Sequence, residues 1–496
     1  MKKKNILKLI LIFLIGAIFI TLLSKNSFLF RFNDWWDANA FMTVGKGILN
    51  GIVPYRDLFE QKGPYLYFIY SVAALISNKT FIGVYFLELV AMFINLIFVR
   101  KIIKLFYKEE IYSFLGIIIY CFSAFFVFTF GHGGSAEEFT LPLMFISMYY
   151  YISYLKDKKC DNMDKKELLL NGMIAGIVFW IKYSLLGFWF IFAATVCLIP
   201  LFKKDIKTAI INALIFVGGM LIATIPCLVY FAINHAVGDL LNIYLLVNMT
   251  SYASKTGILL KIWKMIYILL GNIFGNIPYL LLILVPIIML YKRDILKGKN
   301  YAKIWFTGAF LFTGMGAFIG GTAYFYYGYI LTPFTIIGIL YIIDIIKRKE
   351  IKVKNVHLGI LMIIFLGVLL ITSDNTKYMK WEKSDYAQFI FADIIEKSDE
   401  KTLLNYYGLD FGLYTTTGIN PEYYYFMRNN IPHENYPKMR KTQKKYIKSD
   451  DRPKYVIAKK EYDLLKEHYD IIAVKKQRYE NRKITYYLYE RKNNQD

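Results

Sequence analysis

Long apolar runs separated by short polar segments fill residues 5–373 of the 496-residue chain. Runs of about 17–25 apolar residues match the thickness of the hydrocarbon core of a bilayer. We therefore predict an α-helical polytopic membrane protein. Its eleven spans are expected near residues 5–23, 80–99, 110–131, 139–155, 168–181, 184–202, 208–231, 267–291, 303–320, 324–346 and 356–373.

The lysines and arginines between these runs predict the orientation of the chain. Pro64–Ser77 is apolar but short, and we place it as a half-helix at the outer interface. With this choice, the alternate loops that begin with 100–109 hold 22 Lys and Arg, whereas the short loops on the other side hold three. Because positively charged loops stay in the cytoplasm, we predict a cytoplasmic N-terminus and an extracytoplasmic C-terminus.

Residues 374–496 are polar, rich in Tyr and Lys, and have no run long enough to span a bilayer. Helical periodicity over Tyr386–Lys397 and Glu461–His468 alternates with four runs typical of strands. These runs are Thr402–Tyr407, Lys454–Ile457, Ile471–Val474 and Ile484–Tyr489. We predict a transmembrane domain over residues 1–373 and a small extracytoplasmic α/β domain over residues 374–496.

Composition agrees with a membrane protein, because 56% of the residues are hydrophobic and the mean hydropathy is +0.39. The formal net charge of +23 would also suit nucleic acid binding. The lysines, however, cluster in short segments between apolar runs, which is typical of an orientation signal. We expect no nucleic acid partner. The four cysteines have no thiolate-ligand spacing and predict neither a disulfide framework nor a zinc site.

The stretch Asn33–Pro64 is neither apolar enough to cross a bilayer nor polar enough to be a plain loop. Apolar residues recur in it at helical spacing, at Ala40, Phe41, Val44 and Ile48. The predicted amphipathic helix carries Asp34 and Asp37 one turn apart, and Glu60 and Lys62 follow it. Carboxylates and a lysine held at the lipid headgroup layer favour chemistry on a membrane-bound substrate.

Further ionisable and tyrosine side chains fall on the same predicted side of the membrane. They are Glu137 and Glu138 at the start of the fourth span, Lys182 between two spans, and Tyr326 and Tyr329 at the head of the tenth. Ionisable groups at membrane depth are costly and are therefore functional candidates. The structural alternatives are a snorkelling lysine, acids that complement a helix dipole, and tyrosines of an interfacial belt.

These residue types suit one kind of reaction. A carboxylate at an outer cleft can take a proton from an incoming hydroxyl, and lysine and tyrosine can hold a phosphate. A phosphate leaving group has a second pKa of about 6. It can depart without the general acid that ordinary glycoside hydrolysis requires. One base with a cationic phosphate clamp predicts sugar transfer from a lipid phosphate.

On these residues the chain resembles the GT-C superfamily of integral-membrane glycosyltransferases, in the branch of the lipid A aminoarabinose transferase and the protein O-mannosyltransferases. Asp37 matches the catalytic Asp at the start of that branch's interfacial helix. Glu60-Gln61-Lys62-Gly63-Pro64 is similar to a Glu-Lys-Pro-Pro element with one residue inserted. Ile181-Lys182-Tyr183 corresponds to a lysine-containing turn, and Tyr329-Ile330-Leu331 to a Tyr-Ile-Leu motif. The chain departs from the pattern where a lysine expected before that motif is replaced by tyrosine.

The resemblance implies a glycosyltransferase that moves a hexosyl or pentosyl group from a polyprenyl-phosphate donor. The acceptor would be an extracytoplasmic cell-envelope glycan such as a teichoic acid or a capsule. The implied roles are a general base for Asp37, donor-phosphate binding for Lys62, Lys182 and Tyr329, and orientation of donor or acceptor for Glu60 and Glu137. Asp34, Glu138 and Tyr326 are secondary candidates. Dependence on a divalent metal stays open, because no set of histidines is evident.

Two other functions stay open. A lipid-linked sugar flippase or transporter would carry charges at the bilayer midplane and often inverted repeats, whereas here the charges fall at the predicted outer surface. An envelope polysaccharide polymerase or ligase would have a large, arginine-rich outer loop, whereas the 232–262 loop carries only Lys255 and Lys261.

A basic set in the C-terminal region has two interpretations, a solvated helix face or a surface for an anionic polymer. Its members are Lys438, Arg440, Lys441, Lys444, Lys445 and Lys448.

Overall fold

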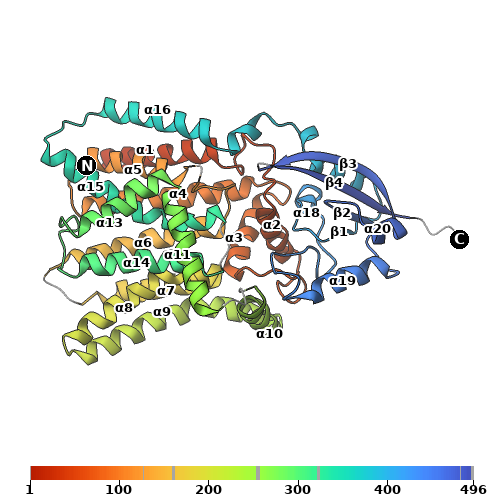
Figure 1. Ribbon diagram of the computed structural model, residues 1–496, viewed down its shortest axis with the longest axis horizontal. Coiled ribbons are helices and arrows are strands. Elements are labelled where there is room, and N and C mark those ends of the chain that lie inside the picture. Colours follow the sequence, from red (N-terminus) through yellow and green to blue (C-terminus); the bar gives the residue numbers. More distant parts are fainter. Residues whose placement is uncertain are drawn as a thin grey trace. The chain divides into compact units, whose positions relative to one another are not determined.

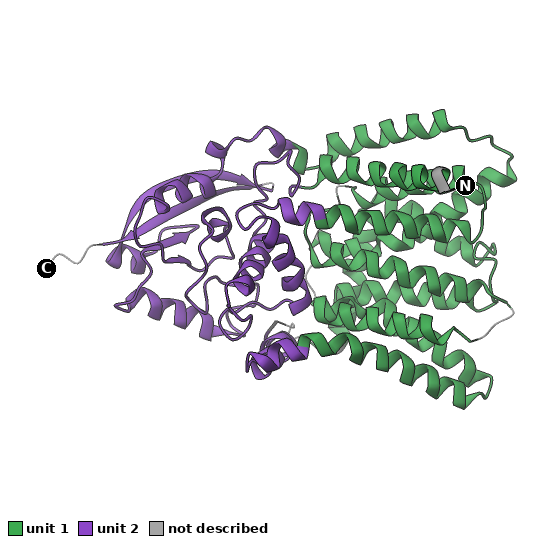
Figure 2. Cartoon of the chain, turned by 180° about the vertical axis from the view of Figure 1, so that it is seen from behind, with its two compact units in different colours: residues 1–24, 87–227, 255–376 green, residues 25–86, 228–254, 377–496 purple. Residues whose placement is uncertain are grey.

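The computed structural model describes residues 2–126, 128–158, 162–252, 257–320, 324–480 and 482–492, so Lys255 lies outside the described residues. The chain divides into two compact units (Figure 2). Unit 1 contains residues 1–24, 87–227 and 255–376, and unit 2 contains residues 25–86, 228–254 and 377–496. Unit 2 therefore combines the stretch around Asp37 with the C-terminal region. The boundary between domains at residue 373 stays a prediction.

Unit 1 is helical, and most of its long helices run roughly parallel to one another (Figure 1). The longer helices are α1 (Lys2–Leu23), α4 (Ile82–Lys104), α5 (Glu110–Ala124), α6 (Ala136–Lys156), α7 (Lys165–Lys182), α8 (Gly187–Phe202), α9 (Ile206–Ile233), α11 (Ile258–Phe274), α14 (Ala302–Ala317), α15 (Ile336–Arg348) and α16 (Asn355–Thr372). Short pieces are η1 (Tyr183–Leu186), α12 (Ile277–Tyr279), η3 (Leu280–Leu284), α13 (Val285–Leu290) and the 3₁₀ segment η4 (Phe325–Thr335). The last residues of α9 and the first of α4 belong to unit 2.

Six helical stretches in the described part of the chain are long and apolar enough to cross a membrane, and a seventh arises if one bent pair counts as a span. The six are Lys4–Leu23, Ile82–Lys104, Lys165–Phe202, Ile206–Ile233, Tyr326–Arg348 and Asn355–Thr372. Large apolar side chains such as Ile363 and Ile371 of α16 are exposed, as expected for a surface that meets lipid. The protein is a multi-pass membrane protein, and the count of eleven spans stays a prediction.

One expected helix is broken in the structure. The run 267–291 does not form a continuous helix, because the helices Leu259–Phe274 and Ile277–Leu290 meet at 97°. Gly275 and Asn276 lie at the break, and the Asn276 side chain accepts a hydrogen bond from the amide of Tyr279. A side chain that caps the start of a new helix offers the backbone an alternative to continuing the preceding helix. Pro278 favours the same break, because proline is well tolerated only in the first turn of a helix. Likewise, the helix expected over 110–131 ends at Ala124.

Unit 2 combines short helices with a sheet. Its helices are α2 (Trp36–Leu49), α3 (Pro64–Ile76), α10 (Val237–Leu240), α17 (Ala387–Ile395), α18 (Leu413–Thr417), α19 (Pro437–Lys448) and α20 (Asp463–His468), with a π-helical segment, Leu241–Tyr252, and a 3₁₀ turn at Lys383–Asp385. A second 3₁₀ turn, Asn375–Lys380, begins in unit 1 and ends in unit 2. Its strands are β1 (Leu403–Asn405), β2 (Tyr455–Ala458), β3 (Tyr469–Tyr479) and β4 (Arg482–Arg491). The helix expected over Pro64–Ser77 is confirmed, and at 13 residues it is too short to span hydrocarbon.

The sheet has the strand order β1-β2-β4-β3. β1 pairs with β2 in parallel, and β4 is antiparallel to both β2 and β3. Leu404, Val456 and Tyr489 from three strands pack in one buried cluster with Ile447 of α19 and Leu465 of α20. All four predicted strands are present, and the prediction of an α/β arrangement in the C-terminal region is confirmed.

Helix α2 differs from the expectation of an amphipathic helix with one wet face. Every residue from Trp36 to Gly47 is buried. α3 packs along one side of α2 within unit 2, while Trp36 stacks on Tyr479 of β3 with ring centroids 4.2 Å apart. The polar residues of α2 are therefore enclosed by the protein, which the periodicity of α2 alone does not indicate.

Candidate functional site

In unit 1, Lys182 and Glu137 form a close ion pair. Lys182 ends α7 with an extended backbone conformation, φ −164° and ψ 99°. Its Nζ lies 2.5 Å from Oε1 of Glu137, in the first turn of α6. The same ammonium lies 3.6 Å from the centre of the Tyr327 ring, a cation–π contact. The sequence predicted both charged residues as site residues, and the structure places them in direct contact.

Glu138, the neighbour of Glu137, lies in a different environment. Its Oε2 accepts a hydrogen bond from the amide of Gly134 at 2.8 Å. The Ser135 hydroxyl caps α6 by accepting a hydrogen bond from the amide of Glu138. The Glu138 carboxyl also interacts with that of Glu88 on α4. Two like charges close together are costly, so neighbouring acids of this kind favour a state in which one proton is shared.

Glu88 is a candidate that the sequence reasoning missed. Its side chain is fully buried, and its Oε2 accepts a hydrogen bond from Ser24 Oγ at 2.7 Å. The available signal was a single acid inside the apolar run Val84–Met92. An ionisable residue within a span is a functional candidate, and this one belongs to the same cluster as Glu138.

Tyr326 and Tyr329 lie on the 3₁₀ segment Phe325–Thr335. Tyr329 is buried and contacts Phe130 edge-on, with ring centroids 5.6 Å apart. Tyr326 is half-buried and contacts Tyr327 edge-on at 4.9 Å. A 3₁₀ segment of 11 residues is unusually long and is often a feature of functional regions. Tyr327, rather than Tyr326 or Tyr329, makes the cation–π contact with Lys182.

In unit 2, Asp37 lies in the first turn of α2 and is only 7% exposed. Asp34, three residues earlier, is more deeply buried and has a different role. Its Oδ1 lies 2.7 Å from Nζ of Lys25, and both side chains are 1% exposed. Asp34 is thus one member of a buried, structural ion pair.

The start of α2 is attached to the sheet of unit 2. Besides stacking on Tyr479, Trp36 donates its Nε1–H to the hydroxyl of Tyr486 at 3.3 Å. Burial, together with nearby acids that include Asp34 and Asp37, raises the pKa of Tyr479 well above its usual range. Asp37 is therefore positioned by a helix whose first residue is clamped by β3 and β4.

Glu60 and Lys62 lie in the loop between α2 and α3. The Glu60 carboxylate accepts hydrogen bonds from the Tyr67 hydroxyl and from the amide of Lys62, the latter at 2.8 Å. Tyr55 donates to the carbonyl of Lys62 at 2.5 Å. The loop backbone is therefore held from two sides, while Nζ of Lys62 lies 5.8 Å from the centre of the Phe41 ring. Glu60 positions Lys62 through its backbone.

The structure thus gathers the predicted residues into separate groups within each unit. Unit 1 holds Glu137 with Lys182, and Glu138 with the newly found Glu88. Unit 2 holds Asp37 on α2 and Glu60 with Lys62 in the following loop. No three His, Cys, Asp or Glu side chains among the described residues form a group that could hold a metal ion.

A family model matches most of the chain. Residues 2–355 match the N-terminal domain of the competence-induced protein Ccs4. The chain belongs to this family. The match includes every candidate residue from Asp34 to Tyr329, whereas the sheet of unit 2 lies beyond it. Members of the Ccs4 N-terminal domain family therefore share the part of the chain that carries the candidate site.

Solved structures show the fold. ArnT from Cupriavidus metallidurans, crystallised with undecaprenyl phosphate, is similar with a TM-score of 0.58, 9% identity and 98% of each chain covered. The apo form of the same protein gives a TM-score of 0.55, also at 9% identity and 98% of each chain. The Archaeoglobus fulgidus oligosaccharyltransferase gives 0.47 at 11% identity, over 91% of this chain and 67% of that one. No curated protein has a significantly similar sequence. The ArnT likeness confirms the GT-C resemblance at the level of the fold.

Proposed function

We propose that the protein transfers a sugar from a polyprenyl-phosphate donor to an extracytoplasmic glycan of the cell envelope. The observation that carries the proposal is the fold shared with ArnT over 98% of both chains, in a structure that contains undecaprenyl phosphate. A membrane enzyme of this fold meets its lipid donor within the bilayer and its polar acceptor at the surface.

Asp37 acts as the general base. The acceptor hydroxyl oxygen attacks the anomeric carbon of the sugar and forms the new glycosidic bond, while the bond from that carbon to the phosphate oxygen breaks. The hydroxyl proton passes to the Asp37 carboxylate, and polyprenyl phosphate leaves with the bonding electrons. Burial of Asp37 within α2 supports this role, because an enclosed carboxylate is shielded from competing water.

The candidates for binding the donor phosphate are Lys182 and Tyr329 in unit 1 and Lys62 in unit 2. An ammonium has three N–H donors, and Glu137 takes one of those of Lys182, which leaves donors for a phosphate oxygen. The pair with Glu137 and the contact with Tyr327 fix the direction of the Lys182 side chain before the donor arrives. Glu60 holds the loop that carries Lys62. Preorganised charges of this kind stabilise the departing phosphate.

Reconstitution tests the proposal. The full-length protein in proteoliposomes is given a radiolabelled polyprenyl-phosphate hexose or pentose and envelope glycan from cells that lack the protein. We expect label to enter the glycan only when protein is present. Movement of the intact donor across the bilayer with no glycosidic product would instead indicate a flippase.

A further inference from the structure

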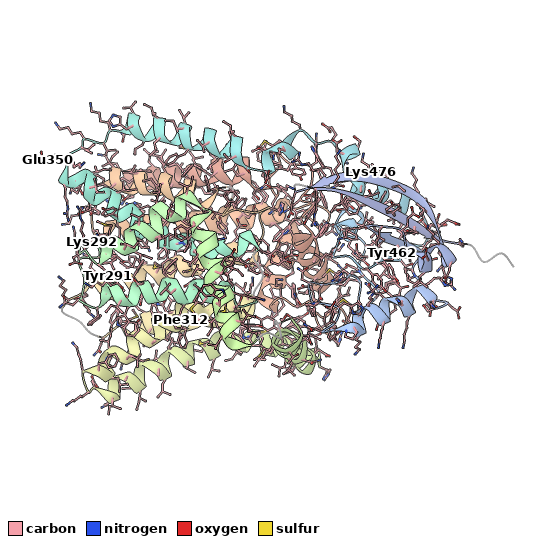
Figure 3. All side chains as sticks on the ribbon, viewed as in Figure 1. Tyr291, Lys292, Phe312, Glu350, Tyr462 and Lys476 are labelled. Carbon is pink, nitrogen blue, oxygen red and sulfur yellow. The ribbon has the colours of Figure 1, made fainter. Side chains whose placement is uncertain are left out.

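Unit 2 carries a basic and aromatic surface that the proposed reaction does not use. Helix α19 contributes six cations, Lys438, Arg440, Lys441, Lys444, Lys445 and Lys448, all of them exposed. The tyrosines Tyr407 and Tyr462 lie next to it and are half-buried. Figure 1 shows α19 close to α20 and the sheet, and Figure 3 shows Tyr462 in the same region. We name these eight residues the α19 surface.

The composition of α19 distinguishes its two sides. The helix has the sequence PKMRKTQKKYIK, which contains no acidic residue. Met439, Gln443 and Ile447 face the core and are buried. The exposed side therefore presents positive charge and no large aliphatic side chain. A helix that lies in a membrane interface needs an apolar face for the lipid, and the apolar side of α19 is already used for packing.

Gln443 joins α19 to the end of strand β1. Its Oε1 accepts a hydrogen bond from the amide of Tyr407 at 3.1 Å. Its Nε2 donates hydrogen bonds to the carbonyls of Asn405 and Tyr425 at 3.0 and 2.9 Å. Tyr407 has a φ of +52°, a left-handed conformation that is costly for a bulky residue. Because strained backbone persists only where the surroundings hold it, the fixed position of Tyr407 beside the basic helix is a built feature.

The tyrosines form a platform surrounded by cations. The Tyr407 ring stacks on Tyr406 at 4.0 Å and meets Tyr462 edge-on at 5.4 Å. The guanidinium of Arg440 lies 4.5 Å from the centre of the Tyr407 ring. Nζ of Lys460 lies 5.1 Å from the centre of the Tyr462 ring. Aromatic rings with cations over their faces suit a ligand that has both apolar C–H groups and negative groups.

We infer that the α19 surface binds a polyanionic glycan, with phosphate or carboxylate groups on the cations and sugar rings packed beside Tyr407 and Tyr462. The inference rests on the proposed function and narrows it, because it makes the acceptor an anionic polymer. The glycan is held by unit 2 while one of its hydroxyls reacts. A polymer of regularly spaced charges matches cations distributed along three turns of a helix better than a single phosphate does.

Binding to a defined probe tests the inference. The full-length protein in neutral nanodiscs is titrated with poly(glycerol phosphate) bearing sugar substituents, at two salt concentrations. The test variant is Lys441→Gln/Lys444→Gln/Lys445→Gln. Its matched control is Lys397→Gln/Lys401→Gln/Lys476→Gln, which removes three exposed lysines outside α19 (Lys476 is labelled in Figure 3). We expect the test variant to lose about tenfold in affinity and to show a shallower salt dependence, while the control stays within about twofold.

Three results would overturn the inference: equal loss in both variants, equal affinity for a single-stranded oligonucleotide of the same charge, or stronger capture by anionic lipid vesicles. A Tyr462→Leu variant addresses the sugar contact and should weaken the substituted polymer more than the bare one. Sugar transfer is measured in parallel. Transfer without polymer binding refutes the α19 surface and leaves the proposed function intact. Binding without any transfer supports the α19 surface and refutes the proposed function.

Discussion

The ammonium of Lys182 lies 2.5 Å from a carboxylate oxygen of Glu137, whose side chain is only 1% exposed. Removing one member of a buried ion pair leaves the other charge uncompensated, and this costs more than the pair itself contributes. The contact therefore has a structural consequence that is separable from any role of Lys182 in binding phosphate.

A double substitution separates the two roles. Lys182→Met should destabilise the protein by about 3–5 kcal/mol, because Glu137 is left buried and unpaired. Adding Glu137→Gln removes the stranded charge and should recover much of the thermal midpoint, measured in detergent. If Lys182 binds the donor phosphate, the double variant stays inactive in sugar transfer although it is folded. Recovery of both stability and transfer would show that the lysine serves only the fold.

The contact between Glu88 and Glu138 predicts a shared proton. Infrared spectra at neutral pH should contain a protonated carboxyl band that disappears in the double variant Glu88→Gln/Glu138→Gln. The single variant Glu88→Gln should change stability by only about 1 kcal/mol, because glutamine can donate to Glu138. Glu110 on α5 pairs with Arg100 and Lys104, and Glu110→Gln is the control that leaves the band unchanged. A spectrum of the wild type without such a band would contradict the assignment.

Two glycines of α2 predict opposite outcomes for the same substitution. A Cβ on Gly45 would lie 2.7 Å from the backbone carbon of Tyr70 on α3, whereas one on Gly47 would lie 3.4 Å from its nearest neighbour, Ile52. Gly45→Ala should therefore cost about 1–3 kcal/mol through overpacking. Gly47→Ala should be neutral or slightly stabilising, because alanine favours helix. Equal thermal midpoints for the two variants would refute the close packing of α2 on α3.

The sequence predicted most of the architecture, because the length of an apolar run and the period of the hydrophobic pattern are local properties of the chain. The strands of unit 2 and the helix of Asp37 follow from alternation and helical spacing. The break at Gly275–Asn276 was missed, because the apolar residues on both sides continue the pattern and only the cap at Asn276 interrupts it.

The site was predicted in its residue types but not in its pairings. Lys182 and Glu137 were assigned separately, and their contact depends on how α6 and α7 pack. Asp34 was a secondary candidate, and nothing in the local pattern indicates its ion pair with Lys25. Glu88 was overlooked because a single acid in an apolar run does not disturb the hydropathy pattern. Long-range pairs such as Thr43 with Asp410 have no local signal at all.

The pH dependence of stability follows from Lys46 and Asp410, both buried in unit 2. Burial lowers the pKa of Lys46 to about 7, against the opposing charge of Asp410. Burial raises the pKa of Asp410 to about 6, against hydrogen bonds from Thr43 and Gly412. Between pH 7 and 10.5 the unfolded chain holds the Lys46 proton that the folded one has lost, so stability rises with pH. Between pH 3.8 and 6 the folded chain holds the extra proton on Asp410, so stability falls as pH rises.

These two groups predict a minimum of stability between pH 6 and 7 and a rise above it. The rise is at most about 1.4 kcal/mol per pH unit. Lys46→Met removes the titrating ammonium, so the thermal midpoint of the variant should change less between pH 7 and 9 than that of the wild type. The control Lys401→Met changes an exposed lysine of the same unit and should keep the wild-type slope. An unchanged slope in Lys46→Met would contradict the assignment.

Asp37 provides the most direct test of the central claim that this fold carries out sugar transfer with a carboxylate base. Asp37→Asn keeps the size of the side chain and removes the base, and Asp393→Asn, exposed on α17, is the matched control. The measurement is the initial rate of sugar transfer in proteoliposomes, at equal amounts of folded protein. The account predicts a loss of at least about 100-fold for Asp37→Asn and a rate within about twofold of wild type for the control. A rate for Asp37→Asn close to that of the control would contradict it.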